Sequence, residues 1–234
     1  MKSEKKESAK RSKGGFQMAT DFHLLWGLPI LKTKIDSNSF NKKEILDTIE
    51  QNYNKSNIRE NWFTVGGGYF ETNIHHSLCD DENKNFTKPD YHLLEKIYIE
   101  VIKNYLNNLG FYKDFNFDYK IINYTASRHE SIMEPHLHIE CEFSMIHYLQ
   151  FENNTHSSTV FMNPYTFNDF WINKNKLSDK MSPKNTNHSW VFGEWKYDIQ
   201  EDDCIIFPSI LKHFVRNKNT EKTRITIASN ISIK

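Results

Sequence analysis

The sequence lacks the long apolar run that a membrane span requires. No stretch approaches the ~20 consecutive apolar residues of a transmembrane helix, and the charged N-terminus is not followed by the apolar segment of a secretion signal. These absences exclude the integral membrane classes and predict a cytoplasmic protein.

Cysteines are also few, and the net charge is zero. The three cysteines, Cys79, Cys141 and Cys204, are widely spaced and form no Cys-x-x-Cys pair, which argues against a disulfide framework or a thiolate zinc site. The 30 Lys and Arg residues are balanced by 30 Asp and Glu residues, so the chain lacks the basic footprint of a dedicated nucleic-acid binder. Nucleic acid is therefore not an expected partner. The oligomeric state stays open, with a homodimer as one alternative.

The chain is long enough, and has enough hydrophobic residues, to form one folded domain. It contains 234 residues, of which 38% are hydrophobic and 14% aromatic, as in globular proteins. The first fifteen residues carry six Lys or Arg against two Glu, so residues 1–20 are predicted to be a disordered basic tail. Residues 21–234 are predicted to form a single domain.

Helical periodicity is confined to the first half of this domain, and residues 41–110 are predicted to give helical support. Asn41 is a candidate N-cap for a helix with Ile45, Ile49 and Tyr53 on one face. A second helix is expected from Asp90 to Leu109, and Gly110 would end it. A short strand is expected before them, between Phe22 and Ile35.

From residue 115 onward the pattern changes to short strands separated by Asn, Asp, Pro and Lys clusters. A mainly β domain with flanking helices and a jelly-roll core over residues 115–234 is therefore predicted. The polar residues 165–188 would form a long surface loop, of the kind that covers binding sites. The expected strands are Phe115–Tyr124, Ile132–Ile139, Phe143–Phe151, Thr159–Met162, Trp190–Tyr197, Cys204–Phe207, His213–Arg216 and Thr223–Ile233.

Three potential metal ligands stand at alternate positions in the segment 134–140, which reads Glu-Pro-His-Leu-His-Ile-Glu. In a strand, residues two apart point to the same face, so His136, His138 and Glu140 would share one cavity. Two imidazoles and one carboxylate around a first-row divalent metal are typical of non-haem iron oxygenases. For any one of these histidines alone, an exposed strand position would be the commoner explanation.

A second candidate group follows near the C-terminus. The apolar strand that ends at Pro208 leads through a turn to His213, which could return to the same cavity. Eleven residues later, Arg224 begins a strand whose alternation puts Arg224 and Thr226 on a polar face. A buried guanidinium needs an anion, and its planar fork suits a carboxylate. A nearby Asp or Glu of the protein is the commoner partner for one Arg taken alone.

These motifs together resemble the 2-oxoglutarate-Fe(II) oxygenase family that is frequent in bacteria and marine phages. The specific part is Ile-Phe-Pro-Ser-x-Leu-x-His over residues 206–213, followed by Arg-x-Thr from Arg224. The His136-x-His138 pair, the Phe-Ser-Met-Ile-His-Tyr-Leu segment 143–149 and the Phe-Met-Asn-Pro segment 161–164 agree with it. The resemblance implies a double-stranded β-helix (cupin-like) fold that uses Fe(II), 2-oxoglutarate and dioxygen.

The resemblance also implies roles for individual residues. It implies His136, His138 and His213 as metal ligands, and Arg224, Thr226 and Tyr148 as co-substrate-binding residues. Coordination chemistry favours the alternative set of His138, Glu140 and His213, so both sets stay open. Met145 and His147 replace residues that are usually Gly and Tyr in the family, and the role of His147 stays open.

The sequence therefore predicts a dioxygenase that hydroxylates a peptide or protein side chain, or a small molecule, and releases succinate and CO2. Its prime substrate cannot be read from these residues. The alternative is a non-catalytic metal-binding jelly-roll module, in which the histidines hold zinc or no metal.

Overall fold

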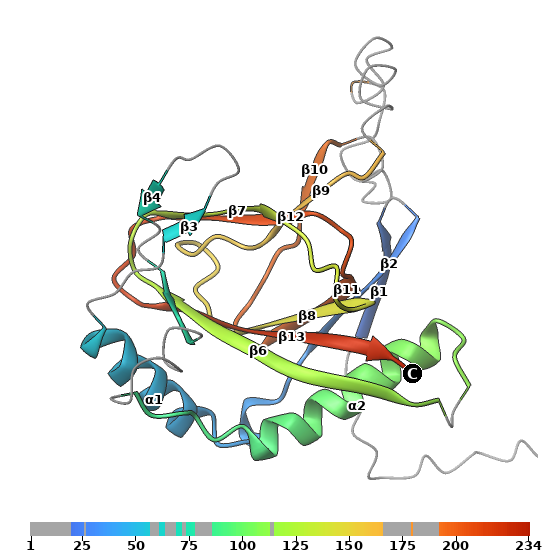
Figure 1. Ribbon diagram of the computed structural model, residues 1–234, viewed down its shortest axis with the longest axis horizontal. Coiled ribbons are helices and arrows are strands. Elements are labelled where there is room, and N and C mark those ends of the chain that lie inside the picture. Colours follow the sequence, from blue (N-terminus) through green and yellow to red (C-terminus); the bar gives the residue numbers. More distant parts are fainter. Residues whose placement is uncertain are drawn as a thin grey trace, which may run out of the picture.

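The computed structural model describes residues 20–25, 27–56, 61–63, 69–71, 74–77, 86–112, 115–165, 179 and 192–234. Residues 1–19 of the predicted basic tail, most of the predicted loop 165–188 and Cys79 lie outside these residues. Two antiparallel sheets face each other, and the two helices lie outside one of them (Figure 1). A separate pair joins β3 (Asn61–Phe63) to β4 (Tyr69–Glu71).

The larger sheet has seven strands in the order β1-β2-β11-β8-β13-β6-β5. Its outer strands β1 and β2 form a hairpin whose turn contains Gly27 at a φ of 78°, a left-handed conformation that glycine adopts without strain. The strands are β1 (Thr20–Leu25), β2 (Leu28–Lys34), β11 (Asp203–Pro208), β8 (Phe143–Gln150), β13 (Arg224–Ile233), β6 (Phe117–Ser127) and β5 (His75–His76).

The two helices, α1 (Lys42–Lys55) and α2 (His92–Asn108), cover the outer face of this sheet (Figure 1). Their buried residues recur at helical spacing, and Gly110 at a φ of 88° ends the second helix as the sequence predicts. A short 3-10 helix, Ser37–Ser39, precedes α1. The helices and the sheet share one core, which includes Ile45, Ile49, Leu94, Tyr98, Val101, Tyr105, Leu149, Ile206, Ile225, Ile227 and Ile231.

The smaller sheet has the order β10-β9-β12-β7. A second core fills part of the space between the sheets and contains Tyr148, Phe161, Phe207 and Leu211, all fully buried. The strands of this sheet are β10 (Glu194–Lys196), β9 (Val160–Met162), β12 (His213–Asn217) and β7 (Ser131–His136).

Strand β13 separates the two cores in the way that its alternation predicts. Ile225, Ile227 and Ile231 are fully buried against the helices, whereas Arg224 and Thr226 face the space between the sheets. A register shift after Ala228 adds Ser229 to the inner face, which strict alternation would not place there.

The predicted mainly β fold with flanking helices is confirmed, but one strand next to the candidate site is shorter than predicted. The strand expected over Ile132–Ile139 ends at His136, and residues 139–142 form a turn. Asn41 is the N-cap residue of α1, as predicted, although its side chain makes no capping bond and instead contacts Glu44 and the Asp90 carbonyl. None of the helices in the described part of the chain has the length and apolar character needed to cross a membrane.

Candidate metal centre and adjoining cavity

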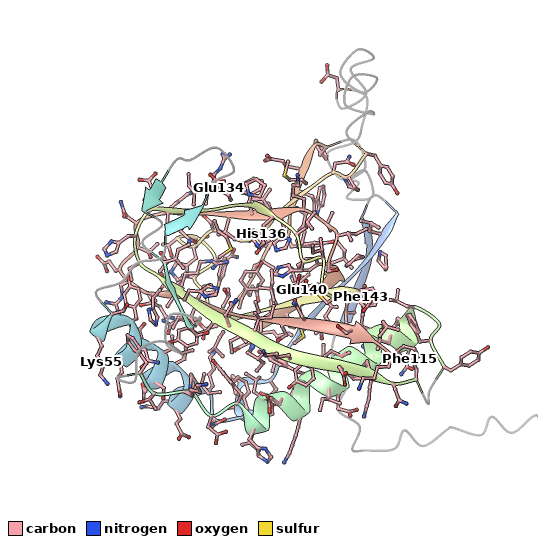
Figure 2. All side chains as sticks on the ribbon, viewed as in Figure 1. Lys55, Phe115, Glu134, His136, Glu140 and Phe143 are labelled. Atoms are coloured by element: carbon pink, nitrogen blue, oxygen red, sulfur yellow. The ribbon has the colours of Figure 1, made fainter. Side chains whose placement is uncertain are left out.

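Three imidazoles converge where the smaller sheet meets the turn that follows β7. His136 is the last residue of β7, and His213, the first residue of β12, is its direct cross-strand partner. His138 lies beyond the end of the strand, where its backbone N–H donates to the Ser209 carbonyl at 3.0 Å. Figure 2 shows His136 directed into the interior. Two strands and one turn thus supply the three side chains.

The three rings are close enough to share one ion. The candidate ligand atoms of His136, His138 and His213 all lie within 4.8 Å of one another. The ring centroids of His136 and His213 are 4.3 Å apart, and the His138 ring stacks on that of His213 at 5.6 Å with an interplanar angle of 13°. Imidazole nitrogens in this arrangement suit a first-row divalent metal.

Hydrogen bonds orient two of these rings. The Nδ1 atoms of His136 and His213 lie 2.7 and 2.9 Å from the carbonyls of Glu134 and Leu211, so each nitrogen carries its proton and donates it. Each Nε2 atom then keeps its lone pair for a metal. Burial lowers the pKa of His136 and His138, and it lowers that of His213 to about 3. The rings are therefore neutral, as metal binding requires.

Glu140 lies at the edge of this group. Its side chain is 63% exposed, and its Oε1 atom is 3.8 Å from Nδ1 of His138. The same oxygen accepts a hydrogen bond from Asn230 Nδ2 at 3.0 Å. Among the residues that the structure describes, the cluster able to hold a metal contains His136, His138 and His213, without Glu140. Glu140 nevertheless lines the cavity that adjoins the three imidazoles.

A cavity of about 320 Å³ joins the imidazoles to the inner face of the larger sheet. Its apolar wall includes Ile122, Met133, Met145, Ile146, Phe207, Val215 and Ala228. Its polar wall includes His76, Asn123, Thr125, Ser144, Thr159, Arg224, Thr226 and Ser229. The two groups that the sequence places 77 residues apart, at 136–140 and 213–224, thus line one space.

Arg224 contributes a positive charge to the wall of this cavity. It is 5% exposed, its Nε donates to the Ser157 carbonyl at 2.9 Å, and its guanidinium lies 5.6 Å from the centre of the Tyr148 ring. Burial lowers the pKa of its guanidinium. No carboxylate in the described ranges lies within ion-pair distance of Arg224. A buried cation without a protein carboxylate favours an anionic ligand.

Thr226 and Tyr148 have different relations to the cavity. The Thr226 hydroxyl lines it and lies 2.7 Å from the hydroxyl of Thr125, its cross-strand partner. Tyr148 is fully buried behind Arg224, and its hydroxyl donates to Thr159 Oγ1 at 2.8 Å. Its ring therefore supports Arg224 from behind, and the hydroxyl is already engaged within the protein.

Sequence reasoning missed several cavity residues. Thr125 lies beyond the predicted end of its strand, but pairing with the Arg-x-Thr strand places it directly opposite Thr226. His76, 2% exposed, belongs to the two-residue strand β5, which lies opposite Thr125 at the sheet edge. The signal for Thr125 was the pairing of two long strands; a two-residue strand such as β5 leaves no periodic signal.

The comparison with known families agrees with this geometry. The profile of the 2OG-Fe(II) oxygenases matches residues 124–230, which contain both groups of cavity residues. Over this region the chain is similar to the 2OG-Fe(II) oxygenase family. The protein is thus a 2-oxoglutarate-dependent non-haem iron oxygenase, with iron and 2-oxoglutarate as cofactors and dioxygen as a reactant. No curated protein matches the chain significantly.

Solved structures share the oxygenase fold at low sequence identity. The non-haem α-ketoglutarate-dependent epimerase SnoN from nogalamycin biosynthesis matches with a TM-score of 0.53 and 10% identity, over 87% of this chain and 76% of its own. AviO1 from Streptomyces viridochromogenes Tue57 matches with a TM-score of 0.51 and 10% identity, over 87% of this chain and 89% of its own. The predicted jelly-roll architecture is therefore confirmed.

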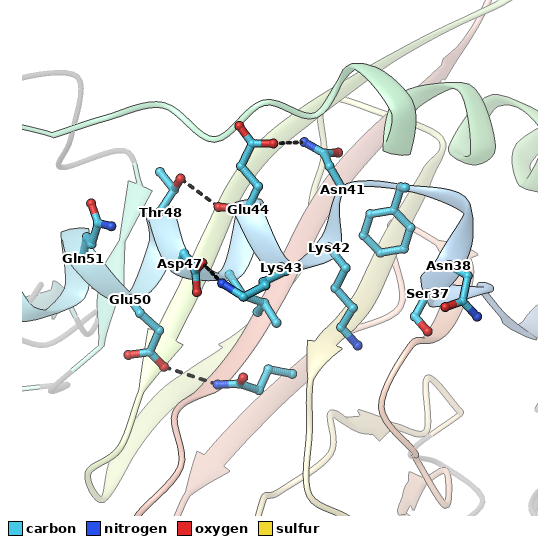
Figure 3. A pocket seen from close by; sticks show the side chains of 13 residues that line it. Ser37, Asn38, Asn41, Lys42, Lys43, Glu44, Asp47, Thr48, Glu50 and Gln51 are labelled. Atoms are coloured by element: carbon cyan, nitrogen blue, oxygen red, sulfur yellow. Dashed lines mark hydrogen bonds and ion pairs between the residues drawn. The ribbon is translucent and has the colours of Figure 1, made fainter.

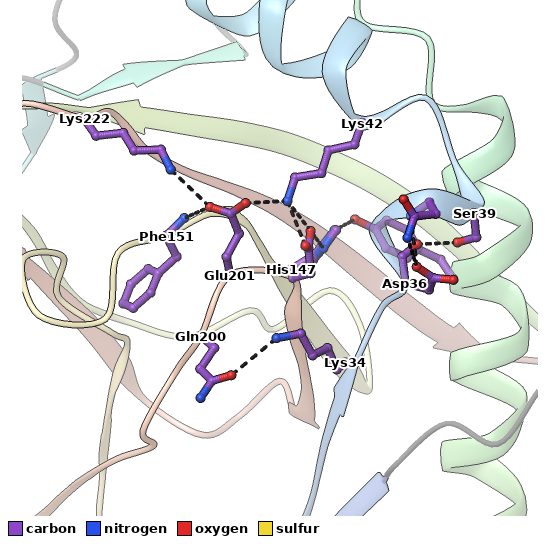
Figure 4. A network of polar contacts seen from close by, with 12 residues as sticks. Lys34, Asp36, Ser39, Lys42, His147, Phe151, Gln200, Glu201 and Lys222 are labelled. Atoms are coloured by element: carbon purple, nitrogen blue, oxygen red, sulfur yellow. Dashed lines mark hydrogen bonds and ion pairs between the residues drawn. The ribbon is translucent and has the colours of Figure 1, made fainter.

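His147, whose role the sequence left open, faces away from the oxygenase cavity. Its ring is fully buried between helix α2 and the sheet, with Nδ1 2.8 Å from the Tyr98 hydroxyl and Nε2 3.7 Å from Asp202 Oδ1. Lys42 closes the cluster with bonds of 2.7 and 2.8 Å to the Asp202 carboxylate (Figure 4). This side chain connects the helices to the sheet and has no place in the metal centre.

A larger hollow of about 940 Å³ lies along α1 and is distinct from the oxygenase cavity. Its wall is polar, and the side chains bond to one another, as Lys43 does to Asp47 at 2.5 Å and Gln150 to Glu50 at 3.3 Å (Figure 3). Paired charges of this kind are typical of a solvated helix surface.

Proposed function

We propose that His136, His138 and His213 hold the Fe(II) ion of this oxygenase. Three observations support this set: the spacing of the ligand atoms, the backbone carbonyls that orient two of the rings, and the low pKa of His213, about 3. Three ligands on one side of an ion leave further coordination positions for co-substrate and dioxygen. Glu140, the competing candidate, lies outside this group.

We further propose that Arg224 and Thr226 bind the distal carboxylate of 2-oxoglutarate. The observation that carries this proposal is a buried guanidinium, 5% exposed, without a described carboxylate partner and in the same cavity as the imidazoles. The guanidinium can donate two parallel hydrogen bonds to a carboxylate, and the Thr226 hydroxyl can add a third. The Tyr148 ring and the Ser157 carbonyl hold the guanidinium in place.

The reaction that this arrangement supports is hydroxylation of a C–H bond in a peptide or protein side chain or a small molecule. Bound iron and 2-oxoglutarate supply the oxidation by dioxygen, in which one oxygen atom enters the product and the other enters succinate as CO2 leaves. The protein supplies position. Arg224 fixes the far end of the co-substrate, and the apolar wall of Met133, Ile146 and Phe207 keeps water away.

The test is anaerobic addition of Fe(II) and 2-oxoglutarate, followed by visible absorption spectroscopy. Chelation of the iron by the 2-oxo acid gives a charge-transfer band, so we expect the band in the parent protein and its loss in His213→Ala. The matched control is His129→Ala, which changes an exposed histidine outside the cavity. This variant should keep the band.

Absence of the band in the parent protein would contradict the proposed function. A parent that binds zinc tightly and shows no band with Fe(II) would instead support the metal-binding module that the sequence left as an alternative. A band that persists in His213→Ala would contradict the ligand set alone.

A further inference from the structure

Each imidazole of the candidate metal centre has an oxygen near its Nδ1 atom. For His136 and His213 this oxygen is a backbone carbonyl, at 2.7 and 2.9 Å. For His138 it is Oε1 of the Glu140 carboxylate, at 3.8 Å. One of the three rings therefore faces a full negative charge, whereas the other two face only peptide dipoles.

We propose that Glu140 is a positioning residue that strengthens metal binding through His138 without touching the metal. This inference rests on the proposed ligand set. It assigns to the carboxylate a role different from the direct ligation that the sequence pattern allows. A carboxylate behind a metal-binding imidazole fixes the ring and raises its basicity toward the metal.

The surroundings of Glu140 explain why it acts from behind the ring. Its side chain is 63% exposed and lies in the turn after β7, so solvent surrounds most of it. Asn230 on β13 donates to the same oxygen that lies near His138, at 3.0 Å, and thereby fixes the position of the carboxylate. Strand β13 also carries Arg224, so one strand supports both ends of the site.

The charge balance of the centre favours the same role. Three neutral imidazoles bring no negative charge to a divalent ion, unlike the two-histidine, one-carboxylate arrangement. The Glu140 carboxylate supplies one negative charge next to the cluster. Only the imidazole ring of His138 would separate this charge from the ion. This charge offsets part of the ion's charge while the metal keeps its open positions.

The experiment compares metal binding in Glu140→Gln with that in Glu142→Gln. Glu142 lies on the same turn and accepts a bond from the Ile233 backbone at 2.8 Å, so its variant makes the same change of charge away from the cavity. Affinity is measured by isothermal titration calorimetry with Fe(II), under anaerobic conditions and without 2-oxoglutarate. We expect Glu140→Gln to weaken binding by roughly 10-fold to 100-fold, and Glu142→Gln to match the parent.

Two further measurements separate support from ligation. Glu140→Gln should keep the charge-transfer band with 2-oxoglutarate at saturating iron, displaced to shorter wavelength because a less basic His138 gives the iron less electron density. Asn230→Ala should weaken iron binding less than Glu140→Gln does, because the carboxylate stays. His138→Ala, which removes a direct ligand, should abolish the band.

Parent-like affinity in Glu140→Gln would overturn the inference, as would a loss of the band equal to that in His138→Ala. An equal loss of affinity in Glu142→Gln would also overturn it, because the effect would then follow the net charge of the turn. If the parent itself fails to bind Fe(II), the proposed function fails, and the inference fails with it.

Discussion

Strand β8 carries buried polar side chains on both faces, and the two faces differ in how those groups are partnered. On the helix side, His147 is enclosed by Tyr98 and by Asp202, whose carboxylate Lys42 binds at 2.7 Å. On the cavity side, Tyr148 supports Arg224, which has no carboxylate partner among the described residues.

This difference separates groups that stabilise the fold from groups that we propose bind ligands. Buried polar groups are normally paired within the protein, because an unpaired one costs free energy. The helix-side cluster follows that rule. On the cavity side, Arg224 has no carboxylate partner among the described residues, which is why we propose that an anionic ligand pairs with it.

The largest effect expected from this comparison is the loss of co-substrate affinity in Arg224→Met. Removal of a buried guanidinium that pairs with a carboxylate costs about 3 kcal/mol of binding, or roughly 100-fold in Kd. Stability should change little or rise, because the cation has no carboxylate partner in the protein. Anaerobic titration of the charge-transfer band with 2-oxoglutarate measures the first quantity, and urea unfolding measures the second.

Arg216→Met is the control for this variant, because Arg216 is exposed on β12 and contacts Phe214 outside the cavity. It should bind 2-oxoglutarate as the parent does. A comparable loss of affinity in both variants, or a large loss of stability in Arg224→Met, would break the distinction between the two faces.

The opposite result is expected on the helix side. Lys42→Met leaves the partly buried Asp202 carboxylate without its cation, and we expect the free energy of unfolding to fall by about 2 kcal/mol, a value reduced from that of a fully buried pair. The Kd for 2-oxoglutarate should not change. Lys43→Met, which removes the adjacent and 89% exposed lysine, should leave both quantities unchanged. Weaker co-substrate binding in folded Lys42→Met would show that the two faces are coupled.

The sequence predicted which side chains share a face within one strand better than it predicted which distant strands pair with each other. Alternation in β13 predicted that Ile225 and Ile227 pack outward and Arg224 inward, because a strand directs side chains by a local rule. The pairing of His213 with His136 depends on hydrogen bonds between strands 77 residues apart, and no local periodicity encodes that register.

The same limit explains why the strand next to the candidate metal centre was predicted too long. Alternation over residues 136–140 assumed a continuous strand, whereas β7 stops at His136 and the Ser209 carbonyl positions His138. Glu140 lines the cavity beside His138 but lies outside the group of three imidazoles, and its side chain is 63% exposed. The resemblance to the oxygenases came from the ligand, Pro-Ser turn and Arg-x-Thr motifs, which are sequence signals of a site whose shape depends on tertiary contacts.

Acid should destabilise the metal-free protein through the cavity-side imidazoles. The pKa of His213 is about 3 in the folded state because of burial, below the usual value near 6.5. Below pH 6.5 the unfolded chain therefore binds a proton that the folded chain does not. From this residue alone, the free energy of unfolding falls by up to about 1.4 kcal/mol per pH unit, until the pH reaches the folded pKa.

Urea unfolding at pH 7, 6 and 5 measures this slope. His213→Gln should reduce it, because the variant has no proton to gain at this position, and His129→Gln should not. Saturating Fe(II) should raise stability at each pH, since a metal that binds only the folded state shifts the equilibrium toward it. An identical slope in His213→Gln and the parent would show that groups other than His213 cause the acid sensitivity.

The smallest effect is expected at Thr226. Thr226→Val removes one neutral donor to the co-substrate carboxylate, which should raise the Kd for 2-oxoglutarate about 5-fold, or ~1 kcal/mol. The variant also breaks the 2.7 Å bond to the Thr125 hydroxyl, a loss that Thr125→Val reproduces. If Thr226 contacts the carboxylate directly, Thr226→Val weakens binding more than Thr125→Val, although both lose the same bond within the protein. Equal losses would mean that the hydroxyl pair acts only as part of the wall, and Arg224 alone would then account for recognition of the carboxylate.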